Sequence, residues 1–181
     1  MKKNIILTGM PGVGKSTVGV ILAKELGYQF VDSDLLIQEQ EGRLLKTIIE
    51  EEGLEGFLRI ENDVNMSIKG QRKVVATGGS AVYSHEAMEA FHRDHLVLYL
   101  HCPYSVLEKR LSDLKGRGVV LKEGQTLKDL YMERTPLYEH YAHLTVEEGH
   151  GGIEETLSKV IRALKDYDVT GRGLGKGTRR R

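Results

Sequence analysis

The chain has 181 residues, of which 40% are hydrophobic and 29% are charged, and its formal net charge is zero. These values are ordinary for a soluble globular protein, and the length suits one domain with a short tail. A single cysteine, Cys102, excludes an internal disulfide and fits a reducing compartment. No apolar run approaches the length of a membrane span, so we expect a cytoplasmic protein without a membrane partner.

The neutral total hides an uneven distribution of charge. Residues 171–181 hold five basic side chains and no acidic one, which leaves 21 basic against 26 acidic side chains in the rest of the chain. An acidic body lacks the basic face by which nucleic-acid-binding proteins are recognised, so we expect no nucleic-acid partner. We expect a single domain over residues 1–168, a monomer, and a disordered basic tail over 169–181.

The first predicted elements are a strand over residues 4–8 and a helix that follows residues 9–17. Residues 9–17 read G-M-P-G-V-G-K-S-T, the phosphate-binding P-loop pattern, in the strand-to-helix context that supports it. Glycines let successive N–H groups turn toward an anion, and the helix adds the positive end of its dipole. A plain glycine-rich turn is the alternative. The candidate nucleotide-binding residues are Gly12, Val13, Gly14, Lys15, Ser16 and Thr17.

A second strand over residues 29–31 ends in Asp32-Ser33-Asp34. A strand, loop, helix and strand in this order predict an α/β fold with a parallel sheet, whose strands carry ligands at their carboxyl ends. Asp32 and Asp34 are therefore expected beside the P-loop. There they would hold a metal or a substrate hydroxyl, or else cap the helix that begins near Leu35.

Residues 35–70 predict a helical insertion in three pieces, broken at Gly42 and Gly53. An insertion outside the alternating pattern is a natural place to bind a second substrate. The third strand, residues 73–77, runs into Gly78 and Gly79. Their N–H groups could receive a carboxylate or hydroxyl of a ligand, although a tight turn is equally consistent with the pair.

The second half of the chain predicts a strand over residues 95–100, a helix that carries Arg110, and a glycine-punctuated lid over about 113–125. Arg117 in that lid is a candidate catalytic residue, with a solvated loop arginine as the alternative. Thr126 caps the next predicted helix, in which Arg134 occupies an apolar-stripe position and so needs an anionic partner. Pro136 predicts a kink or break there. A strand over 144–146 and a helix over 153–164 complete the pattern.

Together these features describe a small phosphotransferase. A GTPase is excluded because the chain has no N-K-x-D motif, and motors and helicases need a longer chain. The order of the P-loop, D-S-D, A-T-G-G, a lid arginine and R-T-P-L-Y resembles the shikimate kinase family over residues 3–165. The resemblance implies a P-loop kinase fold, with a five-stranded parallel sheet flanked by helices. It also implies ATP and Mg²⁺ as cofactors, and phosphorylation of a ring hydroxyl on a small carboxylate, shikimate, to shikimate 3-phosphate.

The resemblance assigns roles on the nucleotide side. Lys15 would hold the phosphates, Ser16 would bind Mg²⁺ with Asp32 close to the metal, Arg117 would be the lid arginine, and Arg110 would lie against the adenine.

On the acceptor side, the resemblance implies that Asp34 binds the substrate hydroxyls and acts as base or orienting group. Gly78 and Gly79 would donate hydrogen bonds to the substrate, and Arg134 would pair with its carboxylate.

The chain also departs from the family pattern. Leu58 stands where a carboxylate-binding arginine is expected, and Arg59 lies one step, or about 100°, farther around the helix. Arg59 is nevertheless a candidate substrate residue. Ser80 replaces a third glycine, and the lid reads R-G-V-V at 117–120. These differences leave open a kinase of another hydroxy acid or polyol, a non-catalytic nucleotide-binding regulator and, less favoured, a nucleoside monophosphate kinase.

Overall fold

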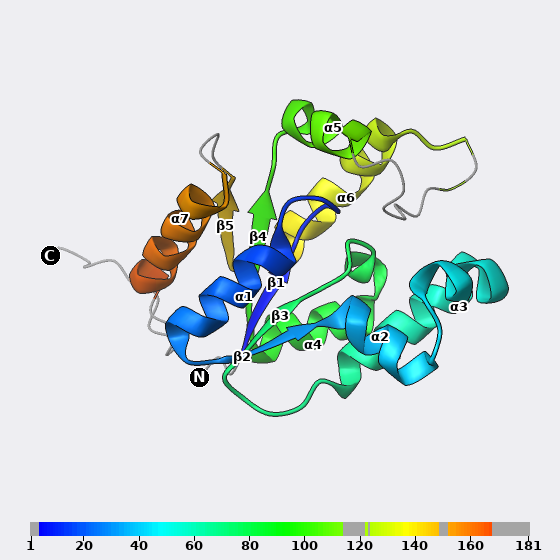
Figure 1. Cartoon of the computed structure of the whole chain (residues 1–181), viewed down its shortest axis with the longest axis horizontal. Helices are drawn as coiled ribbons and strands as arrows, with labels where there is room; N and C mark the ends of the chain where they lie inside the picture. The colour runs from blue at the N-terminus through cyan, green and yellow to red at the C-terminus, as the bar shows by residue number, and fades with distance from the viewer. Residues whose placement is uncertain (1–3, 114–121, 123, 149–151, 168–181) are drawn as a thin grey trace, which may run out of the picture.

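A five-stranded parallel sheet forms the centre of the molecule (Figure 1). The computed structural model describes residues 4–113, 122, 124–148 and 152–167. The strand order is β2-β3-β1-β4-β5, and every neighbouring pair is parallel. The strands are β1 (Ile5–Thr8), β2 (Gln29–Asp32), β3 (Lys73–Ala76), β4 (Leu96–His101) and β5 (Leu144–Glu147). The predicted α/β fold and its five strands are confirmed.

Helices cover both faces of the sheet. On one face α1 packs against α7, and on the other α4 and α6 pack against β4 and against each other (Figure 1). In the described residues the helices are α1 (Lys15–Leu26), α2 (Ser33–Glu41), α3 (Leu45–Ser67), the 3₁₀ helix η1 (Ala81–Tyr83), α4 (His85–Asp94), α5 (Tyr104–Asp113), α6 (Leu127–Tyr141) and α7 (Gly152–Tyr167). Among them, no helix has both the length and the apolar character that crossing a bilayer requires.

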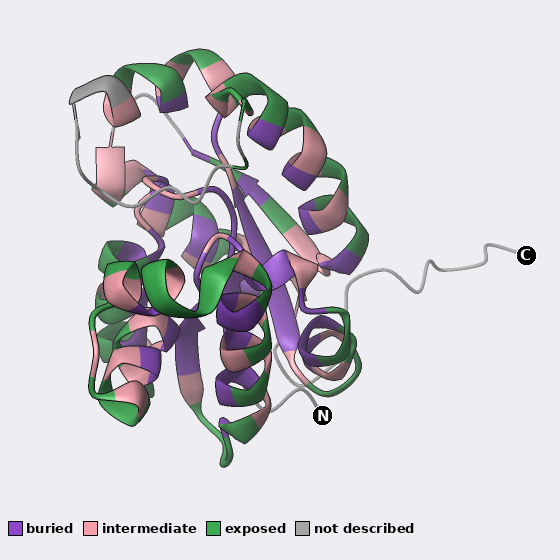
Figure 2. Cartoon of the chain, turned by 90° about the vertical axis from the view of Figure 1, so that its right-hand side faces the viewer, coloured by how far each residue is buried: buried purple, intermediate pink, exposed green. Residues whose placement is uncertain are grey.

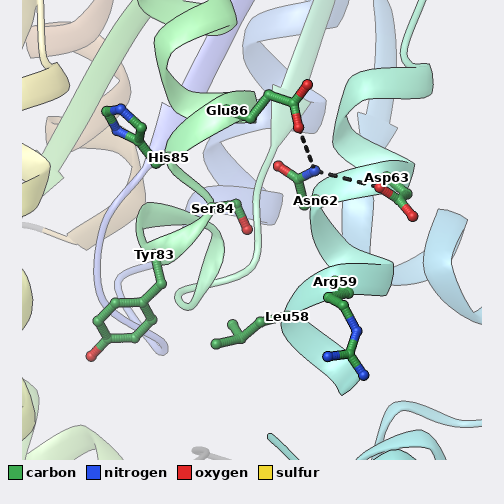
Figure 3. Close-up of a pocket in the computed structure, with 8 residues that line it drawn as sticks. All are labelled: Leu58, Arg59, Asn62, Asp63, Tyr83, Ser84, His85 and Glu86. Carbon is green, nitrogen blue, oxygen red and sulfur yellow. Dashed lines mark hydrogen bonds between the residues drawn. The ribbon is translucent and has the colours of Figure 1, made fainter. Parts of the chain in front are cut away.

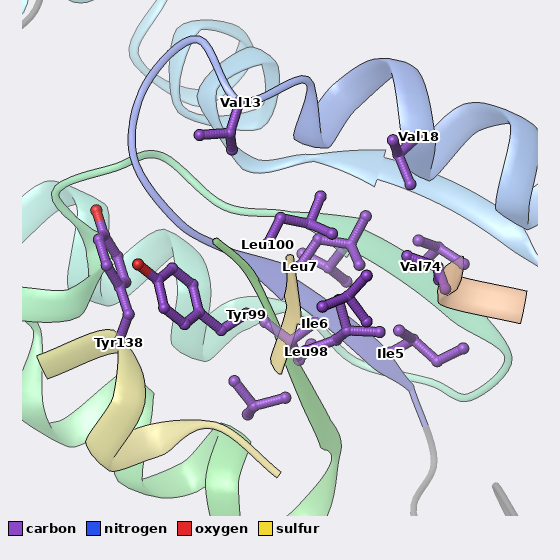
Figure 4. Close-up of a cluster of buried hydrophobic side chains, with 14 of the residues drawn as sticks. Ile5, Ile6, Leu7, Val13, Val18, Val74, Leu98, Tyr99, Leu100 and Tyr138 are labelled. Carbon is purple, nitrogen blue, oxygen red and sulfur yellow. The ribbon is translucent and has the colours of Figure 1, made fainter. Parts of the chain in front are cut away.

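The core follows the two central strands. All four residues of β1 and the first five of β4 are buried, as expected of strands covered on both faces. Figure 2 shows buried residues on the sheet and on the inward sides of the helices. Val13 of the P-loop belongs to the same cluster, as does Tyr99, whose ring stacks on that of Tyr138 at 5.1 Å (Figure 4). The P-loop is thus anchored in the core.

The predicted insertion is present as α2 and α3. Both expected breaks are confirmed, because Gly42 ends α2 in a left-handed conformation and Gly53 interrupts α3 with a φ of 68°. The insertion has a small hydrophobic cluster of its own, formed by Ile37, Ile48, Phe57 and Val64. The insertion therefore has hydrophobic packing of its own, and it also joins the rest of the molecule, since α3 packs against α4.

Helix α6 confirms one prediction and corrects another. Thr126 and Asp129 form the expected cap, in which each side chain accepts from the other residue's backbone N–H. A kink or break was predicted at Pro136, and of these the break is wrong, since α6 continues to Tyr141. Proline deprives the carbonyl four residues earlier of its donor. That carbonyl belongs to Met132, a residue that is 63% exposed, so this position lies on the outer side of the helix.

Two of the predicted segments cannot be compared with the structure. Most of the expected lid at 113–125, with Arg117, lies outside the described residues, and so does the whole tail at 169–181. The lid, the tail and the domain boundary at residue 168 stay predictions.

Candidate active site

The predicted site residues gather at the carboxyl ends of β1, β2 and β3. Strand β1 lies between β3 and β4. The next two strands of the chain, β2 and β3, lie on one side of β1, and the last two, β4 and β5, lie on the other. In open α/β sheets the crevice at such a switch point is where ligands bind. The P-loop follows β1, Asp32 ends β2, and the turn at Gly78 and Gly79 follows β3. These three connections face one another at one edge of the sheet.

The P-loop has the backbone shape that an anion needs. Gly12 and Gly14 both have a φ of 83°, a left-handed conformation that other residues rarely adopt. Helix α1 begins at Lys15, and no side chain in the described part of the chain caps it. The first turn of α1 can therefore offer its N–H groups and the positive end of its dipole to a phosphate.

Lys15 is held inside the loop rather than extended into water. Its side chain is buried, and Nζ donates hydrogen bonds to the carbonyl oxygens of Gly9 at 2.8 Å and Met10 at 2.9 Å. Burial lowers the pKa of Lys15 to about 8, and the nearby carboxylate of Asp34 opposes that change. An anionic ligand beside Nζ would favour the charged form further.

Ser16 and Asp32 are joined by a hydrogen bond, in which Ser16 Oγ donates to Asp32 Oδ2 at 2.7 Å. The other carboxylate oxygen of Asp32 accepts from the N–H of Asp34 at 3.0 Å and of Leu35 at 3.4 Å. Asp32 is thus the N-cap of α2, so the capping and metal-site interpretations apply to the same residue. A hydroxyl and a carboxylate side by side are oxygen ligands of the kind Mg²⁺ prefers, so the residues present fit the metal.

Gly78 lies between two carboxyl groups. A Cβ placed on it would lie 2.5 Å from Glu61 Oε1 and 2.6 Å from Asp34 Oδ1, so both carboxyl groups face the same small space. A side chain at 78 would occupy that space, which explains the glycine. The N–H of Gly78 donates to Ser33 Oγ at 3.4 Å. Burial raises the pKa of Asp34, as does Asp32, while Lys15 lowers it.

Glu61 is the site residue that sequence reasoning missed. It is fully buried, and neither carboxyl oxygen makes a hydrogen bond of good geometry within the described residues. Burial raises the pKa of Glu61 to about 8, a rise that the Ser80 hydroxyl opposes and Asp34 reinforces. Two signals were available. Glu61 ends the G-x-x-x-F…E pattern of the family that the sequence resembles, and it lies four residues after Phe57 and three before Val64, on the buried face of α3.

Arg134 reaches the same turn from α6. It is 2% exposed, its Nε donates to the Tyr83 hydroxyl at 3.2 Å, and its guanidinium lies 5.0 Å from the centre of the Tyr83 ring. Arg134 Nη1 would lie 3.1 Å from a Cβ on Gly79. Within the described residues Arg134 makes no ion pair with a carboxylate. A buried guanidinium without an anion suits an anionic ligand.

Leu58 and Arg59 point in different directions (Figure 3). The side chain of Leu58 extends from α3 toward the ring of Tyr83, whereas exposed Arg59 points away from it. Both line an open pocket of about 360 Å³, together with Asn62, Asp63, Tyr83, Ser84, His85 and Glu86. The structure therefore does not bring Arg59 to the group around Gly78, and its substrate role stays a prediction.

Arg110 is held by a residue that the sequence did not indicate. Its Nη1 lies 2.6 Å from Oε1 of Glu148, whose side chain is 2% exposed, just beyond β5. Leu111 on the same helix would lie 3.0 Å from a Cβ on Gly12, which places this end of α5 beside the P-loop. The position fits a group that flanks a nucleotide, and contact of Arg110 with the base stays a prediction.

Three comparisons agree on the family. A family model described as shikimate kinase matches residues 11–165. Shikimate kinase 2 of Yersinia enterocolitica is 32% identical over 178 residues, which cover 93% of this chain and 99% of that protein. The structure of a shikimate kinase from Acinetobacter baumannii in complex with shikimate is 33% identical and superimposes with a TM-score of 0.84. The match covers 93% of this chain and 96% of the Acinetobacter baumannii chain.

The structure of the shikimate kinase from Aquifex aeolicus is 29% identical, with a TM-score of 0.74. The match covers 90% of this chain and 96% of the Aquifex aeolicus chain. The family match at residues 11–165 includes Lys15, Asp34 and Arg134, together with the turn at Gly78 and Gly79 and the Arg110–Glu148 pair. The chain therefore belongs to the shikimate kinase family of ATP-dependent phosphotransferases.

Proposed function

We propose that this protein transfers the γ-phosphoryl group of ATP to a ring hydroxyl of shikimate, giving ADP and shikimate 3-phosphate. The observation that carries the proposal is the convergence of Lys15, Asp34 and Arg134 at one sheet edge. This reaction needs three groups, and these residues supply them. Lys15 is a cation for the phosphates, Asp34 is a carboxylate for the hydroxyl, and Arg134 is a buried cation for the substrate carboxylate. The shikimate bound in the Acinetobacter baumannii relative supports the same acceptor.

On the donor side, the P-loop N–H groups and Lys15 bind the β- and γ-phosphates. Binding requires Nζ of Lys15 to exchange its contacts with Gly9 and Met10 for phosphate oxygens. Ser16 and Asp32 would hold Mg²⁺, which neutralises charge on the phosphates. Arg117 is proposed to add positive charge from the lid, and Arg110 to flank the adenine.

On the acceptor side, Arg134 binds the carboxylate and Asp34 orients the hydroxyl. As the new O–P bond forms and the bond to the ADP oxygen breaks, the hydroxyl proton moves to the carboxylate of Asp34. Gly78 and Gly79 let the substrate approach the backbone closely, and Tyr138 fixes their turn by donating to the Gly79 carbonyl at 2.6 Å. The predicted contact of Arg59 would need a change in the position of its side chain.

The test is release of ADP by the full chain with Mg-ATP and a panel of acceptors: shikimate, quinate, other hydroxy acids, polyols and nucleoside monophosphates. We expect shikimate to give the highest kcat/KM, with little ADP when no acceptor is present. No ADP with any acceptor would favour a nucleotide-binding regulator, and a faster acceptor would replace shikimate in the proposal. Size-exclusion chromatography tests the accompanying proposal that this cytoplasmic enzyme is a monomer.

A further inference from the structure

We propose that Tyr83 is a positioning residue, whose hydroxyl holds the guanidinium of Arg134 in the orientation that binds the acceptor, and that Glu133 in turn holds this hydroxyl. The inference rests on the proposed function, because it concerns how the same acceptor is bound. It gives a role to two residues that the phosphoryl-transfer steps above do not use.

Tyr83 contacts the guanidinium of Arg134 in two ways. Nε of Arg134 donates a hydrogen bond to the Tyr83 hydroxyl at 3.2 Å, and Cζ lies 5.0 Å from the centre of the Tyr83 ring. A planar guanidinium that is held both by one nitrogen and by an aromatic ring has little freedom to rotate. Its Nη1 lies beside the turn after β3, 3.1 Å from a Cβ placed on Gly79. The contacts with Tyr83 therefore direct this donor toward the acceptor.

Glu133 completes the arrangement from the same helix as Arg134. Because arginine can only donate, the Tyr83 oxygen accepts from Arg134 and its own proton goes to Oε1 of Glu133, at 2.8 Å. Neighbouring residues of a helix point about 100° apart, so Tyr83 bridges two side chains that face in different directions. The carboxylate draws the hydroxyl proton toward itself, which makes the hydroxyl oxygen a better acceptor for Arg134.

Glu133 has further donors that fix its own position. Lys122 Nζ lies 3.0 Å from Oε1 of Glu133, and Gln125 Nε2 donates to Oε2 at 2.7 Å. The hydrogen bonds from Tyr83 and Lys122 lower the pKa of Glu133, so the group is ionised at neutral pH. Both carboxylate oxygens thus have donors, and the acceptor of the Tyr83 proton is held in place.

Leu58 makes the orientation of Arg134 more important. Leu58 extends from α3 toward the Tyr83 ring and offers no charge, while exposed Arg59 points away from that ring (Figure 3). Among the described residues, Arg134 is therefore the arginine that borders the turn at Gly79. A substrate carboxylate bound there depends on the orientation of this one guanidinium.

The first test is Tyr83→Phe, which removes the hydroxyl and keeps the ring. We expect the KM for shikimate to rise by about fivefold, the value of one hydrogen bond to a charged group, with kcat and the KM for ATP within about twofold of wild type. Tyr104→Phe is the matched control, because the Tyr104 hydroxyl donates to Glu108 on α5 at the same distance, 2.8 Å. Melting temperatures of both variants check that the fold is intact.

A double-mutant cycle with Arg134→Ala separates positioning from a structural role or a direct contact with substrate. If Tyr83 acts through Arg134, Tyr83→Phe should change kcat/KM for shikimate by less than about twofold once Arg134 is alanine. Initial rates at low shikimate give kcat/KM even where the KM is too high to reach. A fivefold loss that persists in the Arg134→Ala background would overturn the inference.

Glu133→Leu tests the second link, because leucine cannot accept the Tyr83 proton. We expect the KM for shikimate to rise by about threefold in this variant, and by less than about twofold when the change is added to Tyr83→Phe. Equal effects of Glu133→Leu with and without the Tyr83 hydroxyl would show that Glu133 does not act through Tyr83.

An unaltered KM for shikimate in Tyr83→Phe, with wild-type turnover, would also overturn the inference and would leave the proposed function standing. A wild type that binds ATP but releases no ADP with shikimate marks instead the failure of the proposed function, and this inference falls with it.

Discussion

The donor and acceptor sides of this site differ in how their polar groups are satisfied. On the donor side, Lys15 donates to two loop carbonyls and Ser16 donates to Asp32, so these groups have partners within the chain. On the acceptor side, Glu61 has no good hydrogen bond and Arg134 has no carboxylate within the described residues. The donor side thus exchanges contacts within the chain for contacts with its ligand, whereas the acceptor side depends on its substrate to complete it.

The largest effect should follow Lys15→Ala, which removes the central cation of the donor side. We expect kcat/KM for ATP to fall by about 10³-fold, since the charge that stabilises the phosphates in the transition state is lost. Lys46→Ala is the matched control, because Lys46 is an exposed lysine of α3. An active Lys15→Ala variant would contradict the assignment of the P-loop.

Asp34→Asn tests the residue that joins the two sides. We expect kcat to fall by roughly 10²-fold or more, because an amide cannot accept the hydroxyl proton. The KM for ATP should change little. Steady-state kinetics with each substrate varied in turn would make the distinction, and unaltered turnover would remove Asp34 from the mechanism.

Arg134→Ala tests the acceptor side alone. Loss of a charged hydrogen bond to the substrate carboxylate is worth about 1.5–3 kcal/mol, so the KM for shikimate should rise by roughly 10- to 100-fold. Exposed Arg162 on α7 provides the control variant Arg162→Ala. If the KM for ATP rose instead, Arg134 would belong to the donor side, and the division between donor and acceptor sides drawn above would be wrong.

Leu58→Arg should have a smaller effect, in the favourable direction. A second arginine that faces the acceptor and pairs with Glu61 should lower the KM for shikimate by up to about tenfold. Arg59→Ala, measured beside it, should change the KM by less than about twofold, as expected of an exposed side chain. A large loss in Arg59→Ala would show that Arg59 already binds the substrate.

The smallest predicted effect concerns stability. The folded-state pKa of Glu61 lies above the usual value of 4.5, so the native protein binds more protons than the unfolded chain between about pH 4.5 and 8. The contribution of Glu61 to the free energy of unfolding is therefore complete below about pH 4.5 and is lost as the pH rises through about 8. The melting temperature of Glu61→Gln should therefore fall less than that of wild type between pH 5 and 8, by a few degrees. Parallel curves would argue against a neutral Glu61.

The sequence predicted the P-loop of the donor side because the geometry of that loop is local. The P-loop pattern determines the loop, the start of α1 and the positions of Lys15 and Ser16 within nine consecutive residues. The two glycine breaks in the insertion were equally local, since each needs a left-handed backbone at one position. Hydrophobic patterning gave the five strands for the same reason.

The acceptor side was less predictable because it brings together residues distant in sequence. The proximity of Glu61 to Asp34 and Gly78 follows from how α3 packs, and no local pattern reports it. On the donor side the same holds for Glu148, which pairs with Arg110 across 38 residues. Pro136 shows the converse, because the local rule allowed a break there and α6 continues past it to Tyr141.

The most direct test of the account is the identity of the product. After incubation of the wild-type chain with Mg-ATP and shikimate, phosphorus and proton NMR would locate the transferred phosphoryl group. The account predicts one phosphate ester, coupled to the ring proton at carbon 3, formed in equal amount with ADP. Formation of ADP with inorganic phosphate and no ester would contradict it, since it would mean that the acceptor side does not hold shikimate for transfer.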